Sequence, residues 1–253
     1  MKLAIVYVFH FEFFPASKVL VSTGYAWNSG TETEVIDSEN SNVTCKDLED
    51  FPMELEYGVG ANLASMPIIC GGLHYEMRST SSDKCFIYKG GGWQHFVTLI
   101  NGRQYAAGIV YENTFHIFGG YDSESIGWQR SSEIVNEDGS SIKGPKLPIP
   151  IVFPAIASIN STVSIITGGW TDADLYSDKT WYFNHATQKF HVGPNLLEGR
   201  RYHSSGTITD KETKEQTVIV AGGDNGSIMD STEMLLNGKW VTGKNHNGFV
   251  YFW

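Results

Sequence analysis

The chain lacks the long apolar runs and the helical patterning that mark membrane and α-helical proteins. No stretch reaches about 18 consecutive apolar residues, so no membrane-spanning helix is expected. No interior segment sustains an apolar stripe at helical spacing. Charged residues make up only 18% of the chain and glycine occurs 27 times, which favours short strands joined by tight turns. We therefore expect an all-β protein.

Basic clusters and catalytic motifs are also missing. Lys and Arg are scattered, so nucleic acid is not an expected partner. The formal net charge of −10 is most simply explained by solubility, with binding of a cationic ligand or calcium as the alternative. The sequence contains no Gly-x-Ser-x-Gly, no His-Glu-x-x-His and no phosphate-binding glycine loop followed by Lys. We predict no catalytic residue and no cofactor, and expect the solitary His203 to serve packing and hydrogen bonding.

Cysteine occurs only three times, at Cys45, Cys70 and Cys85. These positions include no close Cys-x-x-Cys pair and no histidine at ligand spacing, so a metal site is not expected. If Cys70 and Cys85 face each other across a hairpin, they can form a disulfide, which the chain-entropy model values at about 3 kcal/mol for this loop length. Two free buried thiols are the alternative, and the role of Cys45 is left open.

What the sequence does contain is a repeat. Short apolar runs that end in glycine recur along the chain, and their last glycines are separated by 48, 48, 49 and 54 residues: Gly24, Gly72, Gly120, Gly169 and Gly223. A near-constant period of this size indicates one repeated structural unit. Each run reads as a buried strand, flanked by one strand before it and two after it. Four strands per repeat correspond to one blade of a β-propeller.

The repeat resembles the kelch family. The features shared with that family are the glycine pair, a charged residue starting the next strand and a large aromatic that follows, as at Trp93 and Trp240. The resemblance covers roughly residues 19–243 and implies a kelch-type propeller of about five four-stranded blades over residues 18–253. The segment around Cys45, with Cys70 and Cys85 downstream, looks like kelch domains of secreted or cell-surface invertebrate proteins. The first repeat has a single glycine and the third lacks its Trp, so those blades should be looser.

The two ends of the chain are ambiguous. Residues 1–17 combine the positively charged Lys2, a short apolar run and small residues at the end of the segment, a pattern typical of a secretory signal peptide. The alternative is a strand of the first blade with alternating aromatic residues. At the C-terminus the chain stops where another first strand would begin. The segment 249–253 either completes the first blade or leaves an incomplete propeller with an exposed edge.

Three sequons support a secreted, glycosylated protein. They start at Asn42, Asn160 and Asn225, all in expected loops or turns. Together with the N-terminal segment they predict an extracellular location, where the disulfide would be stable.

The loops beside the glycine pairs gather on one face in a propeller, and they are rich in aromatic and arginine side chains. These residue types dominate interface energetics, although an aromatic there can also simply pack against the next blade. The candidate binding face consists of Tyr25, Trp27, His74, Tyr75, Tyr121, Trp128, Trp170, Arg103 and Arg200.

These features lead to a hypothesis of a non-enzymatic extracellular module that binds a protein or glycan through this loop face. The first alternative is a carbohydrate-active enzyme, resembling galactose oxidase or a sialic-acid epimerase, both of which use this architecture. The second is an intracellular kelch adaptor or scaffold. The sequence does not identify the ligand, because fold alone does not determine function.

Overall fold

The computed structural model describes residues 9–10, 18–22, 31, 33–37, 49–74, 80–124, 127–210 and 212–244. Over these residues the chain forms antiparallel strands and no helix. It divides into two compact units, which are described separately. Unit 1 comprises Met1–Ile117, Tyr121–Gly127 and Glu133–Lys143, and unit 2 comprises Phe118–Gly120, Trp128–Ser132 and Gly144–Trp253.

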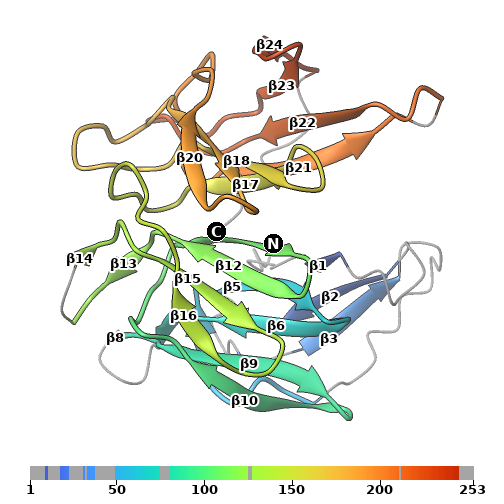
Figure 1. Ribbon diagram of the computed structural model, residues 1–253, viewed down its shortest axis with the longest axis vertical. Coiled ribbons are helices and arrows are strands. Elements are labelled where there is room, and N and C mark those ends of the chain that lie inside the picture. The colour runs from blue at the N-terminus through green and yellow to red at the C-terminus, as the bar shows by residue number, and fades with distance from the viewer. Residues whose placement is uncertain are drawn as a thin grey trace. The chain divides into compact units, whose positions relative to one another are not determined.

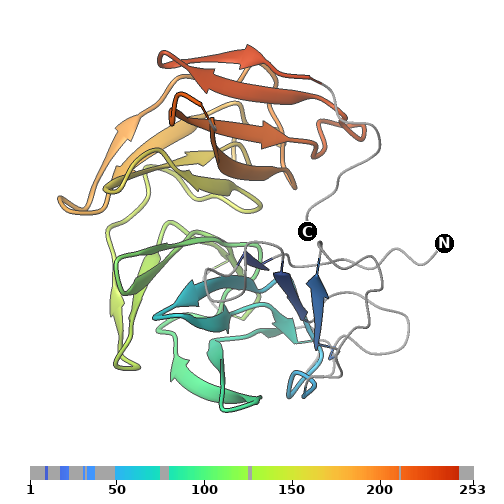
Figure 2. The ribbon, with the colours of Figure 1, turned by 90° about the vertical axis from the view of Figure 1, so that its right-hand side faces the viewer.

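The repeat produces one sheet after another, each with its strands side by side in chain order (Figures 1 and 2). The second sheet contains β5 (Val59–Leu63), β6 (Met66–Cys70), β9 (Lys84–Lys89) and β10 (Gly92–Thr98). The third contains β11 (Ala107–Tyr111), β12 (Thr114–Phe118), β15 (Ser132–Asn136) and β16 (Ser141–Lys143).

Unit 2 contains the fourth and fifth sheets. The fourth is formed by β17 (Ala155–Ser158), β18 (Val163–Thr167), β19 (Thr180–Asn184) and β20 (Lys189–Val192). The fifth is formed by β21 (Ser204–Thr209), β22 (Gln216–Ala221), β23 (Thr232–Leu236) and β24 (Lys239–Thr242). The glycine-ended runs are β6, β12, β18 and β22, the second strand of each sheet, as the sequence pattern predicts.

The first sheet has three strands over the described residues: β1 (Phe9–His10), β2 (Lys18–Ser22) and β3 (Thr33–Asp37). Phe9 pairs with Leu20 and His10 with Val19, which is the strand alternative for the N-terminal segment. The rest of residues 1–17 lies outside the described part, so the signal peptide stays a prediction. Also outside it are Tyr25, Trp27, Asn42, Cys45, Tyr75 and the C-terminal residues 245–253.

Small sheets extend the loops that follow the glycine pairs. One contains β4 (Leu55–Glu56), β7 (Leu73–His74) and β8 (Thr80–Ser81), and the other contains β13 (Tyr121–Asp122) and β14 (Gly127–Trp128). The glycines allow this change of direction. Gly72 has φ of 104°, and a Cβ there would stand 2.7 Å from the carbonyl oxygen of Glu56. Such a conformation and such a close backbone approach favour glycine.

Each unit has its own apolar core. In unit 1 the core contains buried residues of β5, β6, β9, β10, β12 and β15, among them Ile68, Phe115 and Val135. Cys70 and Cys85 are opposite partners of β6 and β9, and they form a disulfide, consistent with the expected pairing. In unit 2 the core includes Ile165 and Val220.

Two of the large aromatics expected after the third strand, Trp93 and Trp240, link their sheet to the one before it. The indole Nε1 of Trp93 donates to Thr33 Oγ1 at 3.1 Å, and that of Trp240 donates to the Pro194 carbonyl at 3.0 Å. Thr33 lies in the first sheet and Pro194 follows the fourth. Both indoles are buried, so the aromatic bodies contribute apolar packing while their single polar groups remain satisfied.

Candidate binding site

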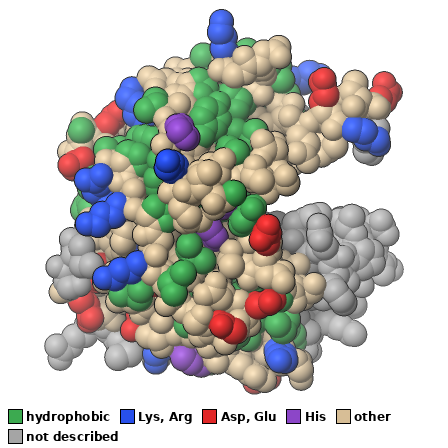
Figure 3. Space-filling view, in the orientation of Figure 1, with side chains coloured by type: hydrophobic (Ala, Val, Ile, Leu, Met, Phe, Trp, Pro, Cys, Tyr) green, Lys and Arg blue, Asp and Glu red, His purple; other side chains and the backbone are tan. Residues whose placement is uncertain are grey.

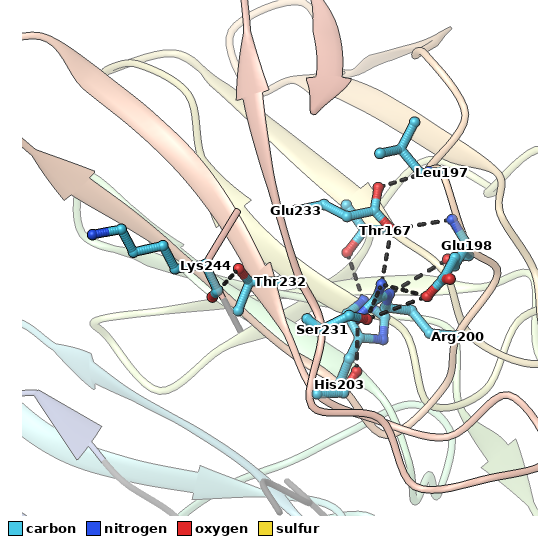
Figure 4. Close-up of polar contacts among 10 residues, drawn as sticks. Thr167, Leu197, Glu198, Arg200, His203, Ser231, Thr232, Glu233 and Lys244 are labelled. Atoms are coloured by element: carbon cyan, nitrogen blue, oxygen red, sulfur yellow. Dashed lines mark hydrogen bonds and ion pairs between the residues drawn. The ribbon is translucent and has the colours of Figure 1, made fainter. Parts of the chain in front are cut away.

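Arg103 and Arg200 were expected on the binding face, and the structure corrects this. Both side chains are fully buried, with 0% exposure, and are therefore not accessible to a ligand. Arg200 Nη2 lies 2.8 Å from Glu233 Oε1 (Figure 4). Arg200 Nη1 donates to the Gly222 carbonyl at 3.0 Å. Arg103 forms the same ion pair with Glu133 in unit 1. Burial lowers the pKa of the Arg103 guanidinium, and the Glu133 carboxylate opposes that shift.

Each of these carboxylates also holds the loop that precedes its arginine. Glu233 accepts the backbone N–H groups of Leu197 at 2.7 Å and Glu198 at 3.1 Å. Glu133 accepts those of Ile100 at 2.7 Å and Asn101 at 3.1 Å. We call each set of arginine, glutamate and two backbone amides a charged latch. Because each latch pairs a buried guanidinium with a buried carboxylate that also accepts two backbone N–H groups, it fixes the geometry of the loop.

His203 lies beside the latch of the fifth sheet. Its Nε2 is 2.8 Å from Thr167 Oγ1, and its ring is buried (Figure 4). Burial, reinforced by the charge of Arg200, lowers the pKa of His203 to about 3. The imidazole is therefore neutral at physiological pH and acts as a packing and hydrogen-bonding group, in agreement with the sequence expectation.

An aromatic residue with a left-handed backbone lies two residues after Arg103 and Arg200, and also two residues after the equivalent positions Leu55 and Ile151. The φ angles are 56° at Tyr57, 61° at Tyr105, 55° at Phe153 and 56° at Tyr202. Positive φ is unusual for a bulky side chain and often accompanies functional sites. In unit 1 the rings of Tyr57 and Tyr105 lie 4.5 Å apart, and in unit 2 those of Phe153 and Tyr202 lie 3.9 Å apart. Sequence reasoning missed this set, although the four positions follow the 48- to 49-residue period of the glycine pairs.

The residue directly after a glycine pair is placed by a short backbone pairing with the residue before this aromatic. In the fifth sheet Asp224 and Arg201 form such an antiparallel bridge, and the Asp224 N–H donates to the Arg201 carbonyl at 2.9 Å. The bridge brings the two side chains together: Arg201 Nε donates to Asp224 Oδ2 at 3.0 Å. The same pairing in the fourth sheet joins Trp170 to Val152.

Arg201 is the centre of a set of aromatic side chains in unit 2. Its guanidinium carbon lies 5.1 Å from the ring centre of Trp170, 5.0 Å from that of Tyr176 and 5.1 Å from that of Tyr202. The Arg201 side chain is 18% exposed, so it reaches solvent while it is held by cation–π contacts. Trp128 packs edge-on against Trp170 at 4.9 Å. We define the aromatic–arginine cluster as Trp128, Trp170, Tyr176, Arg201, Tyr202 and Asp224.

Hydrogen-bonded loops present this cluster. Asp174 N–H donates to Thr171 Oγ1 at 3.0 Å, and Tyr176 N–H donates to Asp174 Oδ1 at 3.1 Å. In the next loop, Gly226 N–H donates to Asp224 Oδ1 at 2.9 Å. Beside the cluster, these same loops carry two exposed aliphatic residues. They are Leu175, 50% exposed, and Ile228, 43% exposed.

In unit 1 the loops after the glycine pairs surround a hollow instead. His74, one of the candidate residues, lines a cavity of about 370 Å³ together with residues near Asp83 and Asp122. Tyr121 is half-buried, and its backbone pairs with Gln104. The structure therefore brings Trp128 and Trp170 together and places His74 at a separate hollow. It excludes Arg103 and Arg200 from the binding face, because both are buried.

Two of the three sequons lie among the described residues. Asn160 and Asn225 are exposed, and Asn160 Oδ1 accepts the N–H groups of Thr162 and Val163 at 2.9 Å in a tight turn. Their glycosylation stays a prediction. The described residues hold no group of three or more His, Cys, Asp or Glu side chains arranged for a metal, and no helix among them could cross a membrane. On the face drawn in Figure 3, several of the Lys and Arg side chains lie along the left edge and the others stand apart from them.

Comparisons with known proteins establish the fold and nothing finer. No protein-family profile matches the sequence, and no curated protein matches it. Among solved structures, the chain is similar to one titled "Structure of YjhT", with a TM-score of 0.78 and 11% identity, covering 99% of this chain and 86% of that one. At this identity the likeness concerns the fold alone. Together with the repeated four-stranded antiparallel sheets, it assigns the chain a β-propeller fold.

Proposed function

We propose that the protein is a non-enzymatic, extracellular kelch-type propeller that binds a protein or glycan through its loop face. The observation that carries this proposal is the aromatic–arginine cluster of unit 2. In it, the partly exposed Arg201 is held by Asp224 and by three aromatic rings. Aromatic and arginine side chains are the most frequent energetic centres of interfaces.

The cluster suits binding because its side chains are ordered before a ligand arrives. Arg201 and Trp170 are each held by neighbouring rings, so little further rotamer freedom would be lost on binding. Leu175, which precedes Tyr176 in the chain, and Ile228, whose backbone pairs with that of Asp224, add exposed aliphatic side chains to the same loops. Indole and phenol rings suit both proposed ligand classes, since they pack against apolar protein side chains and against the C–H face of a sugar.

Two further features support an extracellular location. The disulfide between Cys70 and Cys85 would persist in an oxidising compartment and is uncommon in the cytosol. The exposed sequons at Asn160 and Asn225 are accessible to glycosylation.

The first experiment produces the whole chain in a secretory host and screens it against a glycan array and displayed extracellular proteins. Any ligand captured is then titrated against the wild type, Trp128→Ala and Trp170→Ala. Each substitution is expected to weaken binding by about 2 kcal/mol, roughly thirtyfold, because an interfacial aromatic is lost. The control is Val192→Ala, which removes an apolar side chain that is 82% exposed outside the cluster.

Unchanged affinity in both tryptophan variants would reject this surface as the binding site. The alternative of a carbohydrate-active enzyme is tested in parallel by assays for sugar oxidation and epimerisation, with and without added copper. Turnover by the purified chain would overturn the non-enzymatic proposal. A protein recovered from the cell interior with free thiols would favour the intracellular scaffold.

A further inference from the structure

The hollow in unit 1, which we call the polar pocket, is built by loops from two consecutive repeats. Its volume is about 370 Å³, near the lower end of the usual range for small-molecule sites. It is lined by Met53, His74, Thr80, Ser81, Ser82, Asp83, Lys84, Ile100, Asn101, Gly102, Asp122 and Glu124. The aromatic–arginine cluster lies in the other unit, so the two sites are composed of different residues.

The walls of the polar pocket are fixed by hydrogen bonds between the loops. Ser81 N–H donates to Ser123 Oγ at 2.8 Å, and Ser123 N–H donates to Ser81 Oγ at 3.0 Å. On another wall, the charged latch of Glu133 holds the backbone N–H groups of Ile100 and Asn101. A ligand would therefore meet a largely ordered site, which lowers the entropic cost of binding.

The lining is amphipathic. Met53 and Ile100, the latter 44% exposed, supply an aliphatic wall. Hydroxyl, amide, imidazole and carboxylate groups supply the remainder. A pyranose ring has the matching distribution, with C–H groups on its face and hydroxyl groups around its rim. The size of the pocket limits the ligand to about one such ring.

The charges of the lining restrict which sugar fits. Among the lining residues that the structure describes, the carboxylates of Asp83 and Glu124 stand against the Lys84 ammonium. The third carboxylate, that of Asp122, is buried, accepts the N–H of Glu124 at 3.0 Å and interacts with the Arg103 guanidinium. Carboxylates accept hydrogen bonds from hydroxyl groups and, with charge assistance, from a protonated amine. An anionic sugar would meet like charge here. We propose that the polar pocket binds a single hexosamine residue through its protonated amine, that it binds a neutral hexose less tightly and that it rejects a hexuronate.

In the test, the whole secreted chain is titrated separately with D-glucosamine, D-glucose, D-glucuronate and methylammonium. Saturation-transfer NMR measures the binding of each compound. Glucosamine is expected to bind with a dissociation constant of about 1 mM, as a ligand of so few atoms allows. Glucose should bind about tenfold more weakly, because it lacks the charge-assisted hydrogen bond. Glucuronate and methylammonium should show no saturable binding, the first because of charge repulsion and the second because it lacks a ring.

Variants assign the binding to this pocket. Asp83→Asn and Glu124→Gln should each weaken glucosamine binding severalfold and bring it closer to that of glucose. Ile100→Ser should weaken both sugars alike, because it removes part of the aliphatic wall. Glu137→Gln removes an exposed carboxylate elsewhere in unit 1 and should change nothing.

Three outcomes would overturn the proposal: glucuronate binding as tightly as glucosamine, no saturable binding of glucosamine, or equal affinity in the pocket variants and the wild type. Trp170→Ala should leave glucosamine binding intact. A failure of the aromatic–arginine cluster to bind a partner is therefore distinguishable from a failure of the polar pocket.

Discussion

Equivalent positions of the repeat are stabilised by opposite chemistries in neighbouring sheets of unit 2. In the fifth sheet the carbonyl of Arg200 accepts the N–H of Gly169 at 2.8 Å, and the side chain of Arg200 pairs with Glu233. In the fourth sheet the carbonyl of Ile151 accepts the N–H of Gly120 at 2.8 Å. There, the strand position equivalent to Glu233 is occupied by Trp181.

In the fourth sheet, Ile151 and Trp181 thus occupy the positions that the ion pair of Arg200 and Glu233 occupies in the fifth sheet. Unit 1 shows the same contrast, with Arg103 and Glu133 in the third sheet and Leu55 and Phe86 packed together in the second. Replacing a buried ion pair by well-packed apolar residues is often neutral, whereas removing one partner is costly. The comparison shows that the repeat needs a side chain that fills this buried position, either an arginine paired with a glutamate or an apolar residue. An arginine at this position therefore does not indicate a binding face.

The largest effect is expected from Glu233→Ala, which leaves the Arg200 guanidinium buried without its carboxylate. The free energy of unfolding should fall by about 3–5 kcal/mol. Arg200→Leu combined with Glu233→Phe copies the apolar residues of the second sheet and should recover at least half of that loss. Urea unfolding of the three proteins, followed by tryptophan fluorescence, measures both values. A double variant as unstable as Glu233→Ala would contradict the equivalence of the two chemistries.

A second comparison concerns the residue pair just before the glycine pair. In the second sheet this pair is Cys70 opposite Cys85, and in the fourth it is Thr167 opposite Thr180. Replacing both cysteines by threonine should lower the free energy of unfolding by about 3 kcal/mol, since the disulfide closes a loop of 15 residues in the unfolded chain. The urea midpoint of the wild type should also fall on reduction, while that of the variant should not change. Equal midpoints for the wild type and the variant in the absence of reductant would contradict the prediction.

A smaller effect is expected from pH at His203, beside the charged latch. Its folded-state pKa of about 3 lies below the ordinary value of 6.5, so the unfolded chain alone takes up a proton between these values. Stability is therefore lost as pH falls below about 6.5, at about 1.4 kcal/mol per pH unit. His203→Asn should reduce the loss between pH 6.5 and 5 by about 2 kcal/mol relative to the wild type. Parallel pH dependence of the two proteins would show that His203 is not neutral in the folded state.

The loop face also differs between the two units. In unit 2 the residue after the glycine pair is Trp170 or Asp224, and rings pack around Arg201. In unit 1 the corresponding loops carry His74 and the buried Asp122, and they surround the polar pocket. One backbone scaffold thus presents a packed aromatic surface in one unit and an acidic hollow in the other, because loops accept residues that the strands between them would not.

Much of the fold could be predicted from local patterns. The period of the glycine pairs located β6, β12, β18 and β22, and alternation around them indicated the flanking strands. The hairpin placed Cys70 opposite Cys85, and of the two alternatives that this left open, a disulfide or two free thiols, the structure shows the disulfide. The strands and their order depend on residues close together in the chain and on the restricted conformations of strands and glycine, so the sequence by itself determined them.

Only the tertiary structure decided which arginine is accessible. Arg200 and Arg201 are adjacent in sequence, yet Arg200 is fully buried against Glu233 while Arg201 reaches solvent beside Asp224. Successive side chains of extended backbone point to opposite sides, so one arginine had to turn inward. Which one did so depends on partners 33 and 23 residues away in the chain, which local patterns do not specify.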